Sequence, residues 1–451
     1  MASGRWAVRA PWIGLGAAGV LMLLAFGLPH LLDWQVFARA PRSSHAGGAP
    51  PLHGYWQPTL FGPGTIPALA LALLGWRYAA EWAQRLSWRR LLALSYIGSL
   101  GWLLSLALVD GSRGISRALG NPYEYLRSAR AVDDVAGLLG TYVSRIPIDS
   151  VDAWPTHVAG HPPGALLFFV GLDRVGLGGD FAAGMVVTLM AASSAAAVLV
   201  TLRALGAESV ARVAAPFLVL TPAAVFMAVS ADGLIAAVVA WGIAALALGA
   251  SAPSRGRLIG WSGLAGVLLG SSVMMSYGMP LVGVLAVAVL VLAGNWRPLP
   301  IAVLTASAVV LLFAANGFSW WEAYPVLRER YYDGIAAQRP LDYWIWANLA
   351  LLLVSAGPLI AAGLAAAGTT VSTTARHEQR VALGLVAAGV AMVVLADLSG
   401  MSKAEVERIW LPFIPWLTIS CALLPQRWRA PGLALQAGTA LVVQHLLYTV
   451  W

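Results

Sequence analysis

Charged residues are scarce in this chain of 451 residues. Asp, Glu, Lys and Arg make up 11% of the sequence, whereas they make up roughly a quarter of an ordinary soluble domain. Hydrophobic residues make up 59%, more than one soluble core can bury, because a large shell of any globular protein faces water. The composition therefore excludes a soluble enzyme, a disordered chain and a fibrous repeat.

Cysteine is almost absent, since Cys421 is the only one and lies within an apolar run. This excludes a disulfide framework and a Cys-x-x-Cys metal site. Acidic residues number 20 against 28 basic ones, but the basic residues are scattered between apolar runs rather than gathered in a patch. That spacing is typical of membrane topology signals, and we expect no nucleic acid among the partners.

Continuous apolar runs take up most of the remaining sequence. They do not alternate with polar residues, which excludes an outer-membrane barrel, and a run of about 20 such residues crosses a bilayer as a helix. We expect an all-α polytopic membrane protein with about 13 transmembrane helices, forming a single integral membrane domain over residues 1–451. The expected spans are residues 11–33, 65–83, 91–110, 180–202, 211–229, 233–250, 258–275, 279–294, 299–316, 345–367, 381–398, 409–424 and 431–449.

The stretch 162–178 is also apolar, but it is short, opens with Pro162-Pro163 and contains Asp173-Arg174. A charged pair inside so short a segment does not favour a crossing. We therefore predict a juxtamembrane helix here rather than a further span.

The distribution of charge predicts the orientation. With the N-terminus in the cytoplasm, the segments on that side contain 15 of the 28 basic residues and three of the 20 acidic ones. Loops this rich in arginine are what the positive-inside rule expects in the cytoplasm. We predict a multi-pass protein of the cytoplasmic membrane with an odd number of spans, and the long loops 34–64, 111–179, 317–344 and 399–408 at an extracytoplasmic active face.

Ionisable groups at membrane depth are functional candidates by default. Asp110 ends the third expected span, and Asp232 lies in the tight outer turn between two others. Either could be a solvated carboxylate at a helix end, which is the simpler interpretation. Their shared place at the outer boundary favours a functional one.

The loop 111–179 contains further candidates, namely Glu124, His157 and His161. A carboxylate here could take a proton from an acceptor hydroxyl, and the imidazoles could bind a phosphate or a sugar. On a regular helix the two histidines would share a face and suggest a metal site. Gly160 and the prolines that follow disfavour such a helix, so no cofactor is expected with certainty, and a divalent cation stays an open alternative.

Arginines stand beside aromatic residues in the last two outer loops. We select Arg328, Arg330 and Tyr331 in the first of them, and Glu405 and Arg408 in the second. Guanidinium groups clamp phosphate oxygens, and aromatic rings can stack on sugars. The alternative is an interfacial aromatic belt with arginines whose charged ends reach the headgroups.

Four short motifs follow one another in the first half of the chain: Asp110 at a membrane boundary, His161-Pro162-Pro163-Gly164 opening an apolar helix, Gly176-Leu177-Gly178-Gly179-Asp180 entering a span, and Ser230-Ala231-Asp232 at an outer turn. Over residues 90–240 this order resembles the GT-C superfamily of glycosyltransferases, and within it the protein mannosyltransferase and aminoarabinose transferase branch. The segments 330–334 and 405–410 resemble those of uncharacterised actinobacterial members.

The resemblance implies a GT-C-like fold whose extracytoplasmic loops carry short juxtamembrane helices. It implies a glycosyltransferase that moves a sugar, with inversion, from a polyprenyl-phosphate donor to a cell-envelope glycan, lipid or protein acceptor, among membrane lipids. Asp110 would be the general base, with Glu124 as its rival, and His161 would lie near the donor phosphate. In the family the first large loop usually follows the first span, whereas here two further spans, 65–83 and 91–110, intervene before the loop 111–179.

The alternative function is a membrane transporter or lipid flippase. Such proteins place ionisable groups near the bilayer midplane and often contain paired broken helices. In this sequence the expected spans are nearly free of charge at their centres, and the polar residues gather at one face. This favours an enzyme, while a non-catalytic scaffold stays open.

Overall fold

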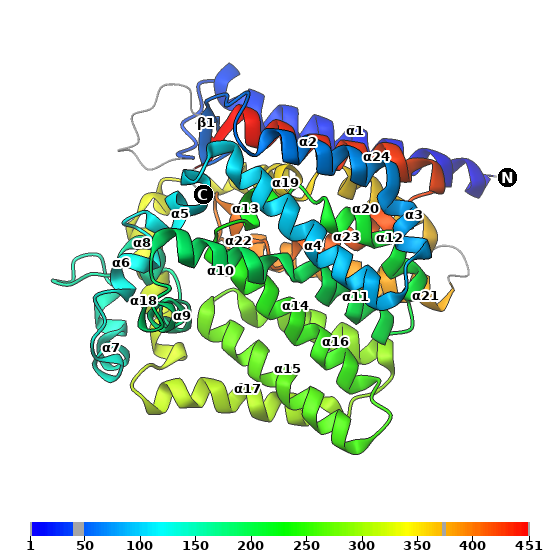
Figure 1. Ribbon diagram of the computed structural model, residues 1–451. Helices are drawn as coiled ribbons and strands as arrows, with labels where there is room; N and C mark the ends of the chain where they lie inside the picture. The colour runs from blue at the N-terminus through cyan, green and yellow to red at the C-terminus, as the bar shows by residue number, and fades with distance from the viewer. Residues whose placement is uncertain (1, 39–48, 372–375, 450–451) are drawn as a thin grey trace.

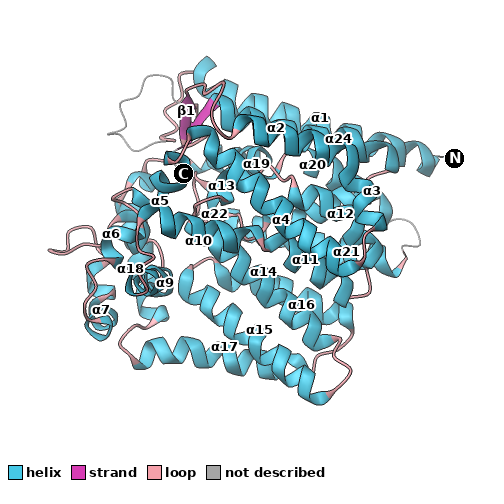
Figure 2. Ribbon diagram, in the orientation of Figure 1, coloured by secondary structure: helices cyan, strands magenta, loops and turns pink. Residues whose placement is uncertain are grey.

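The fold is built almost entirely of helices (Figures 1 and 2). The computed structural model describes residues 2–38, 49–371 and 376–449, and 76% helix content confirms the predicted all-α class. The one sheet in these residues pairs β1 (Gly54–Trp56) antiparallel with β2 (Leu447–Thr449). Residues 39–48 of the expected loop 34–64 lie outside the described residues.

Long apolar helices make up the body of the molecule. Seven of them are long and apolar enough to cross a membrane: α1 (Ala2–Leu31), α4 (Trp88–Ala107) with the 3-10 turn η2 (Leu108–Asp110), the continuous pair α10 (Asp180–Ala192) and α11 (Ser194–Ala204), α14 (Ala231–Ala250), α15 (Arg255–Met275), α17 (Pro298–Ala315) and α21 (His377–Leu398). An eighth candidate consists of α19 (Leu341–Ala356) and α20 (Leu359–Val371), which are bent by 104° at their junction. The chain is a multi-pass membrane protein, and the expected count of about 13 spans is not confirmed.

Shorter helices lie among and beyond the long ones. Within the bundle are α2 (Thr65–Leu74), the π-helical turn η1 (Gly75–Ala79), α3 (Ala80–Arg85), α12 (Glu208–Val219), α13 (Ala224–Met227), η4 (Met279–Leu281), α16 (Val282–Ala293), α23 (Ile414–Thr418), η6 (Ile419–Leu423), η7 (Gln426–Trp428) and α24 (Arg429–Leu446). The connecting segments form α5 (Arg113–Gly120), α6 (Tyr125–Ala129), α7 (Val135–Thr141), η3 (Val143–Arg145), α8 (Thr156–Ala159), α9 (Pro163–Arg174), α18 (Trp320–Asp333), η5 (Ile335–Ala337) and α22 (Val406–Ile409). Figure 1 shows α5 to α9 and α18 gathered at one end of the bundle.

The stretch 162–178 forms the short helix α9, as its sequence predicts. Its first residue is Pro163, and proline suits the first helical turn because the N–H that it lacks has no partner there. The helix contains 12 residues and is about 18 Å long, too short to cross a hydrocarbon layer of about 30 Å.

Close helix packing in the bundle depends on small residues. A Cβ at Gly266 of α15 would lie 2.1 Å from the Ala302 carbonyl oxygen of α17, and one at Gly270 would lie 2.7 Å from that of Ala306. Glycines four residues apart let two membrane helices approach closely. On the other side of α15 lies α14, whose most apolar stretch is 83% buried, so α14 forms the centre of the molecule.

The two ends of α14 lie far apart. The Ser230 hydroxyl accepts a hydrogen bond from the Gly233 backbone N–H at 2.9 Å, which caps the helix and places Asp232 in its first turn. The helix ends at Ala250, about 28 Å from its start at 1.5 Å per residue. Because α14 begins at the end of the bundle where the short helices gather, Asp232 lies at that end.

A sharp bend joins α19 to α20. Gly357 has φ +86°, and a Cβ there would lie 2.0 Å from the Gln436 side-chain oxygen, so the bend requires glycine. The Gln436 amide of α24 donates a hydrogen bond to the Ala356 carbonyl oxygen at 2.8 Å. This satisfies a backbone acceptor that the break in the helix would otherwise leave without a partner.

Candidate functional site

Arg408 of α22 is the centre of a buried charge cluster. Its Nη1 lies 3.1 Å from Glu124 Oε1, and its Nε lies 3.2 Å from Asp232 Oδ2. Its Nη2 lies 3.3 Å from His157 Nε2. One guanidinium therefore ties together the loop before α6, helix α8 and the first turn of α14, which are distant in sequence.

Glu124 is held as an anion. Its Oε1 lies 2.6 Å from His157 Nδ1, and 4% of the residue is exposed. Burial raises the pKa of the Glu124 carboxyl, but attraction and hydrogen bonding from His157 and the charge of Arg408 outweigh burial, so its pKa lies below the usual range. Asp232 is equally buried. Two carboxylates thus face one guanidinium, and the cluster formed by these three groups carries an excess of negative charge.

His157 fits between Glu124 and Arg408 in one tautomer. A guanidinium N–H can only donate, so the arrangement assigns His157 Nε2 as the acceptor from Arg408 and Nδ1–H as the donor to Glu124. In this assignment the imidazole links the carboxylate and the guanidinium through its two nitrogens.

His161 lies beside this cluster. Its Nδ1–H donates to the His157 carbonyl oxygen at 2.8 Å, and the Tyr125 ring packs edge-on against it at 5.9 Å. Burial lowers the pKa of the His161 imidazole. Because α8 ends at Ala159, His157 and His161 do not share one regular helix, and in the part of the chain that the structure describes no group of three or more His, Cys, Asp or Glu side chains is arranged to hold a metal.

A second layer of charge surrounds Glu405. The Arg339 Nη2 lies 3.5 Å from Glu405 Oε1, and His53 Nδ1 lies 3.9 Å from the same oxygen. Burial raises the pKa of Glu405, but His53, Arg339 and Arg408 together outweigh it and lower the pKa to about 2. Arg339 also donates from Nε to the Phe37 carbonyl oxygen at 3.0 Å, so this layer joins the segment after α1 to the segment before α22.

Backbone strain accompanies the two loops that supply Arg408 and Asp232. Ala404 and Glu405 have φ values of +70° and +62°, and Val229 has φ +63°. A β-branched residue in the left-handed region is a genuine outlier, and each such residue costs about 1–3 kcal/mol. Strain of this kind persists only where the surrounding structure imposes it, and here it flanks both partners of one ion pair.

Glu407 is a buried carboxyl that sequence reasoning did not select. It is fully buried, and within the described part of the chain neither side-chain oxygen makes a well-formed hydrogen bond. Burial, together with the nearby charge of Glu405, raises its pKa to about 7, although the backbone N–H groups of Glu407 and His53 and the charge of Arg408 favour the anion. A sequence signal exists, because this acid stands directly between Val406 and Arg408 in front of an expected span.

Six of the ten selected residues lie together in this region: Glu124, His157, His161, Asp232, Glu405 and Arg408. Sequence reasoning passed over Arg339 and His53, which surround Glu405. The signal that could have found Arg339 is its place beside Pro340 in the expected loop 317–344, a few residues before an expected span.

The other four selected residues lie elsewhere or serve other contacts. Asp110 contacts Arg117 at 3.4 Å and Gln444 at 3.5 Å, and Arg328 is exposed. Arg330 donates to the carbonyl oxygens of Ile146 and Trp154, which holds the loop after η3.

The fourth, Tyr331, reaches only the edge of the second layer. Its hydroxyl accepts from the Lys403 backbone N–H at 2.9 Å, and its pKa is raised, chiefly by burial, to about 12. It therefore supports the loop that leads to Glu405 and Arg408.

Searches of protein-family models, of curated proteins and of solved structures find no match to this chain.

Proposed function

We propose that the chain is a polyprenyl-phosphate-sugar-dependent glycosyltransferase whose site is the cluster around Arg408. The observation that carries the proposal is the position of Glu124, a buried anion between His157 and Arg408 at the end of the bundle where the short helices gather. Such a carboxylate is suited to general-base work on an acceptor hydroxyl. The cluster around Arg408 thus brings together the proposed base, a guanidinium suited to binding phosphate and two imidazoles.

The geometry favours Glu124 over Asp110 as the base. Asp110 pairs with Arg117 and Gln444, and none of the groups that contact Arg408 contacts it in the described structure. Glu124 contacts His157 and Arg408 directly. The base would therefore lie beside the group proposed to bind the donor.

Donor binding would activate this base. The arriving phosphate competes with Glu124 for Arg408, since guanidinium forks bind phosphate oxygens at least as readily as carboxylates. Without that pairing the pKa of Glu124 rises, because one of the charges that lower it is withdrawn, and a base with a pKa nearer the working pH is more effective. The acceptor oxygen attacks the anomeric carbon, its proton passes to Glu124, and the bond between sugar and lipid phosphate breaks.

The orientation is part of the proposal. Arg203, Arg212 and Arg257 lie at the end of the bundle opposite Asp232, which supports that end as cytoplasmic under the positive-inside rule. The site would then face the outside of the cytoplasmic membrane. The shorter apolar helix Met279–Ala293 supports a count above the number of long helices and so nearer to about 13 spans.

The test compares Glu124→Gln with Asp110→Asn in proteoliposomes. Donor probes are labelled polyprenyl-phosphate mannose and polyprenyl-phosphate arabinose, added to a crude acceptor fraction of cell envelope. We expect Glu124→Gln to lower transfer about 10²–10⁴-fold and Asp110→Asn to stay within a few-fold of the wild type. The mechanism is wrong if both variants keep full transfer, and the assignment of the base is wrong if only Asp110→Asn loses it.

One observation favours the alternative of a transporter or lipid flippase. The pair α19 and α20 is a broken helix, a feature on which many transporters build their sites. The charge cluster, however, is made at helix ends and in short helices rather than at the bend. Ion flux or lipid scrambling by the purified protein in liposomes, without sugar transfer, would reverse the preference.

A further inference from the structure

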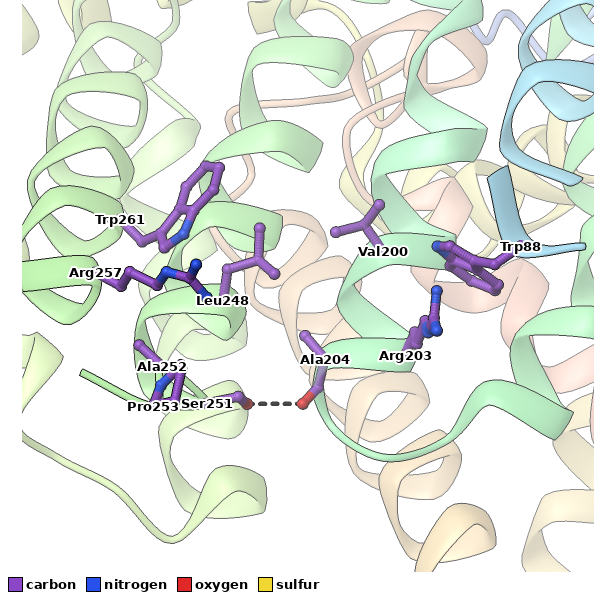
Figure 3. Close-up of a pocket in the computed structure, with 10 residues that line it drawn as sticks. All are labelled: Trp88, Val200, Arg203, Ala204, Leu248, Ser251, Ala252, Pro253, Arg257 and Trp261. Atoms are coloured by element: carbon purple, nitrogen blue, oxygen red, sulfur yellow. Dashed lines mark hydrogen bonds between the residues drawn. The ribbon is translucent and has the colours of Figure 1, made fainter. Parts of the chain in front are cut away.

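A pocket with two arginines in its walls lies at the end of α14 opposite Asp232. It is a cavity of about 400 Å³ lined by the start of α4, the ends of α11 and α14, and the beginning of α15. Figure 3 shows Arg257 and Trp261 on one wall and Arg203 and Trp88 on the other. Ser251 closes the space between α14 and α11 by donating to the Ala204 carbonyl oxygen at 2.7 Å. The volume falls in the range of small-molecule sites.

The charge of this pocket is positive and only partly balanced. Glu208 pairs with Arg203 at 2.9 Å and also with Arg212 at 2.7 Å, so one carboxylate serves two guanidinium groups. No ion pair or side-chain hydrogen bond joins the Arg257 guanidinium to another residue within the described ranges. None of the ten lining residues is acidic. An anion could therefore enter without displacing a protein carboxylate from Arg257.

The walls of this pocket have features typical of a site that binds a lipid headgroup. The Arg203 guanidinium stacks on the Trp88 ring, with Cζ 4.5 Å from the ring centroid, which holds it against the wall. Trp261 is partly exposed, and Val200 and Leu248 supply apolar surface. Tryptophan is enriched at the level of lipid headgroups, and this pocket lies where four membrane-span candidates begin or end. The two guanidinium groups suit a phosphate, and the apolar and aromatic wall suits the acyl chains of a lipid that carries it.

We infer that this pocket binds the phosphate group of an anionic membrane lipid, with Arg203 and Arg257 on either side of it. The same chemistry could be offered by free phosphate, and the apolar wall is what favours the lipid. The inference does not depend on the proposed glycosyltransferase activity, because the pocket is separated from Asp232 by the length of α14.

The experiment measures lipid binding to the full chain in detergent by native mass spectrometry and by thermal stabilisation. The probes are phosphatidylglycerol, phosphatidylcholine and inorganic phosphate, added separately. We expect phosphatidylglycerol to bind and stabilise the wild type, with phosphatidylcholine and inorganic phosphate at least tenfold weaker. Arg257→Gln should weaken phosphatidylglycerol binding at least tenfold.

The matched control is Arg255→Gln, which removes an exposed arginine two residues away on the same helix that does not line the pocket. We expect it to bind phosphatidylglycerol like the wild type. Equal binding by Arg257→Gln and the wild type would overturn the site. Equal binding of phosphatidylcholine, or of inorganic phosphate, would overturn the choice of an anionic lipid as its ligand.

Discussion

At one end of α14, Arg408 is almost fully buried and its guanidinium contacts two carboxylates, whereas at the other end Arg257 is exposed and contacts none among the described residues. Burying charges requires that they lose their hydration, and their mutual attraction does little more than offset this loss. The buried end therefore gains little stability from its ion pairs but depends on each partner being present. The exposed end keeps its arginine hydrated and available to a ligand.

The largest expected effect comes from removing the central guanidinium. Arg408→Met leaves Glu124 and Asp232 buried without their shared partner, which costs about 3–5 kcal/mol in comparable buried pairs. We expect a large drop in the thermal unfolding temperature in detergent and poor accumulation in membranes. The control is Arg328→Met, which removes an exposed arginine; if the two variants unfold at the same temperature, the cluster does not support the fold.

A second prediction concerns the unpaired acid of the buried end. Folded Glu407 keeps its proton up to about pH 7, whereas the unfolded chain releases it near pH 4.5. The unfolded state binds fewer protons between these values, so the free energy of unfolding falls as the pH rises from about 4.5 to about 7.

Glu407→Gln removes this dependence. We expect the variant to be more stable than the wild type at pH 8, by an amount on the order of 3 kcal/mol at most, and to lose the advantage at pH 4.5. Thermal unfolding measured at both pH values checks this. An advantage of equal size at the two pH values would show that titration of Glu407 is not its cause.

Glu124 should show the opposite pH dependence. Its pKa is lowered in the folded state, so its contribution to stability is present above about pH 4.5 and is lost as the pH falls through the folded pKa. We expect Glu124→Gln to lower stability at pH 7 by about 2 kcal/mol, the scale of a hydrogen bond to a charged group. The difference from the wild type should shrink in acid, as unfolding between pH 7 and pH 3 will show.

The smallest effect is expected at the exposed end. Arg257→Gln removes no ion pair in the described structure, so without added lipid its free energy of unfolding should stay within about 0.5 kcal/mol of the wild-type value. Thermal unfolding of Arg257→Gln, measured together with Arg408→Met, compares the two ends of α14 directly. If Arg257→Gln loses as much stability as Arg408→Met, the two ends do not differ in how far the fold depends on their arginines.

Sequence reasoning found the short helix at Pro163 because proline and an internal charged pair are local signals. It also selected Glu124, His157 and Arg408, because ionisable residues are so rare in this chain that each one in an expected outer loop is a candidate. It could not predict that Arg408 meets Glu124 across 284 positions, since no local pattern encodes a contact made by packing.

The selection of Asp110 as the first candidate base rests on a local signal of the same kind, and it stays a prediction. Its position at a helix end is visible in the sequence, but its partners Arg117 and Gln444 are brought to it by the fold. Glu407 was missed for a related reason: which way an acid points from a short helix depends on the neighbours of that helix.

The contact between Asp232 and Arg408 also constrains the path of the chain. Two residues 3.2 Å apart lie at the same end of the bundle, so the chain between them passes from end to end an even number of times. Five of the span candidates fall in this interval, counting the bent pair once, which is odd. The Asn295 amide donates to the Ala250 carbonyl oxygen at 2.8 Å, so Met279–Ala293 returns to the far end. That short helix is the sixth passage. The ion pair therefore shows that counting only the long helices misses one passage of the chain through the bundle.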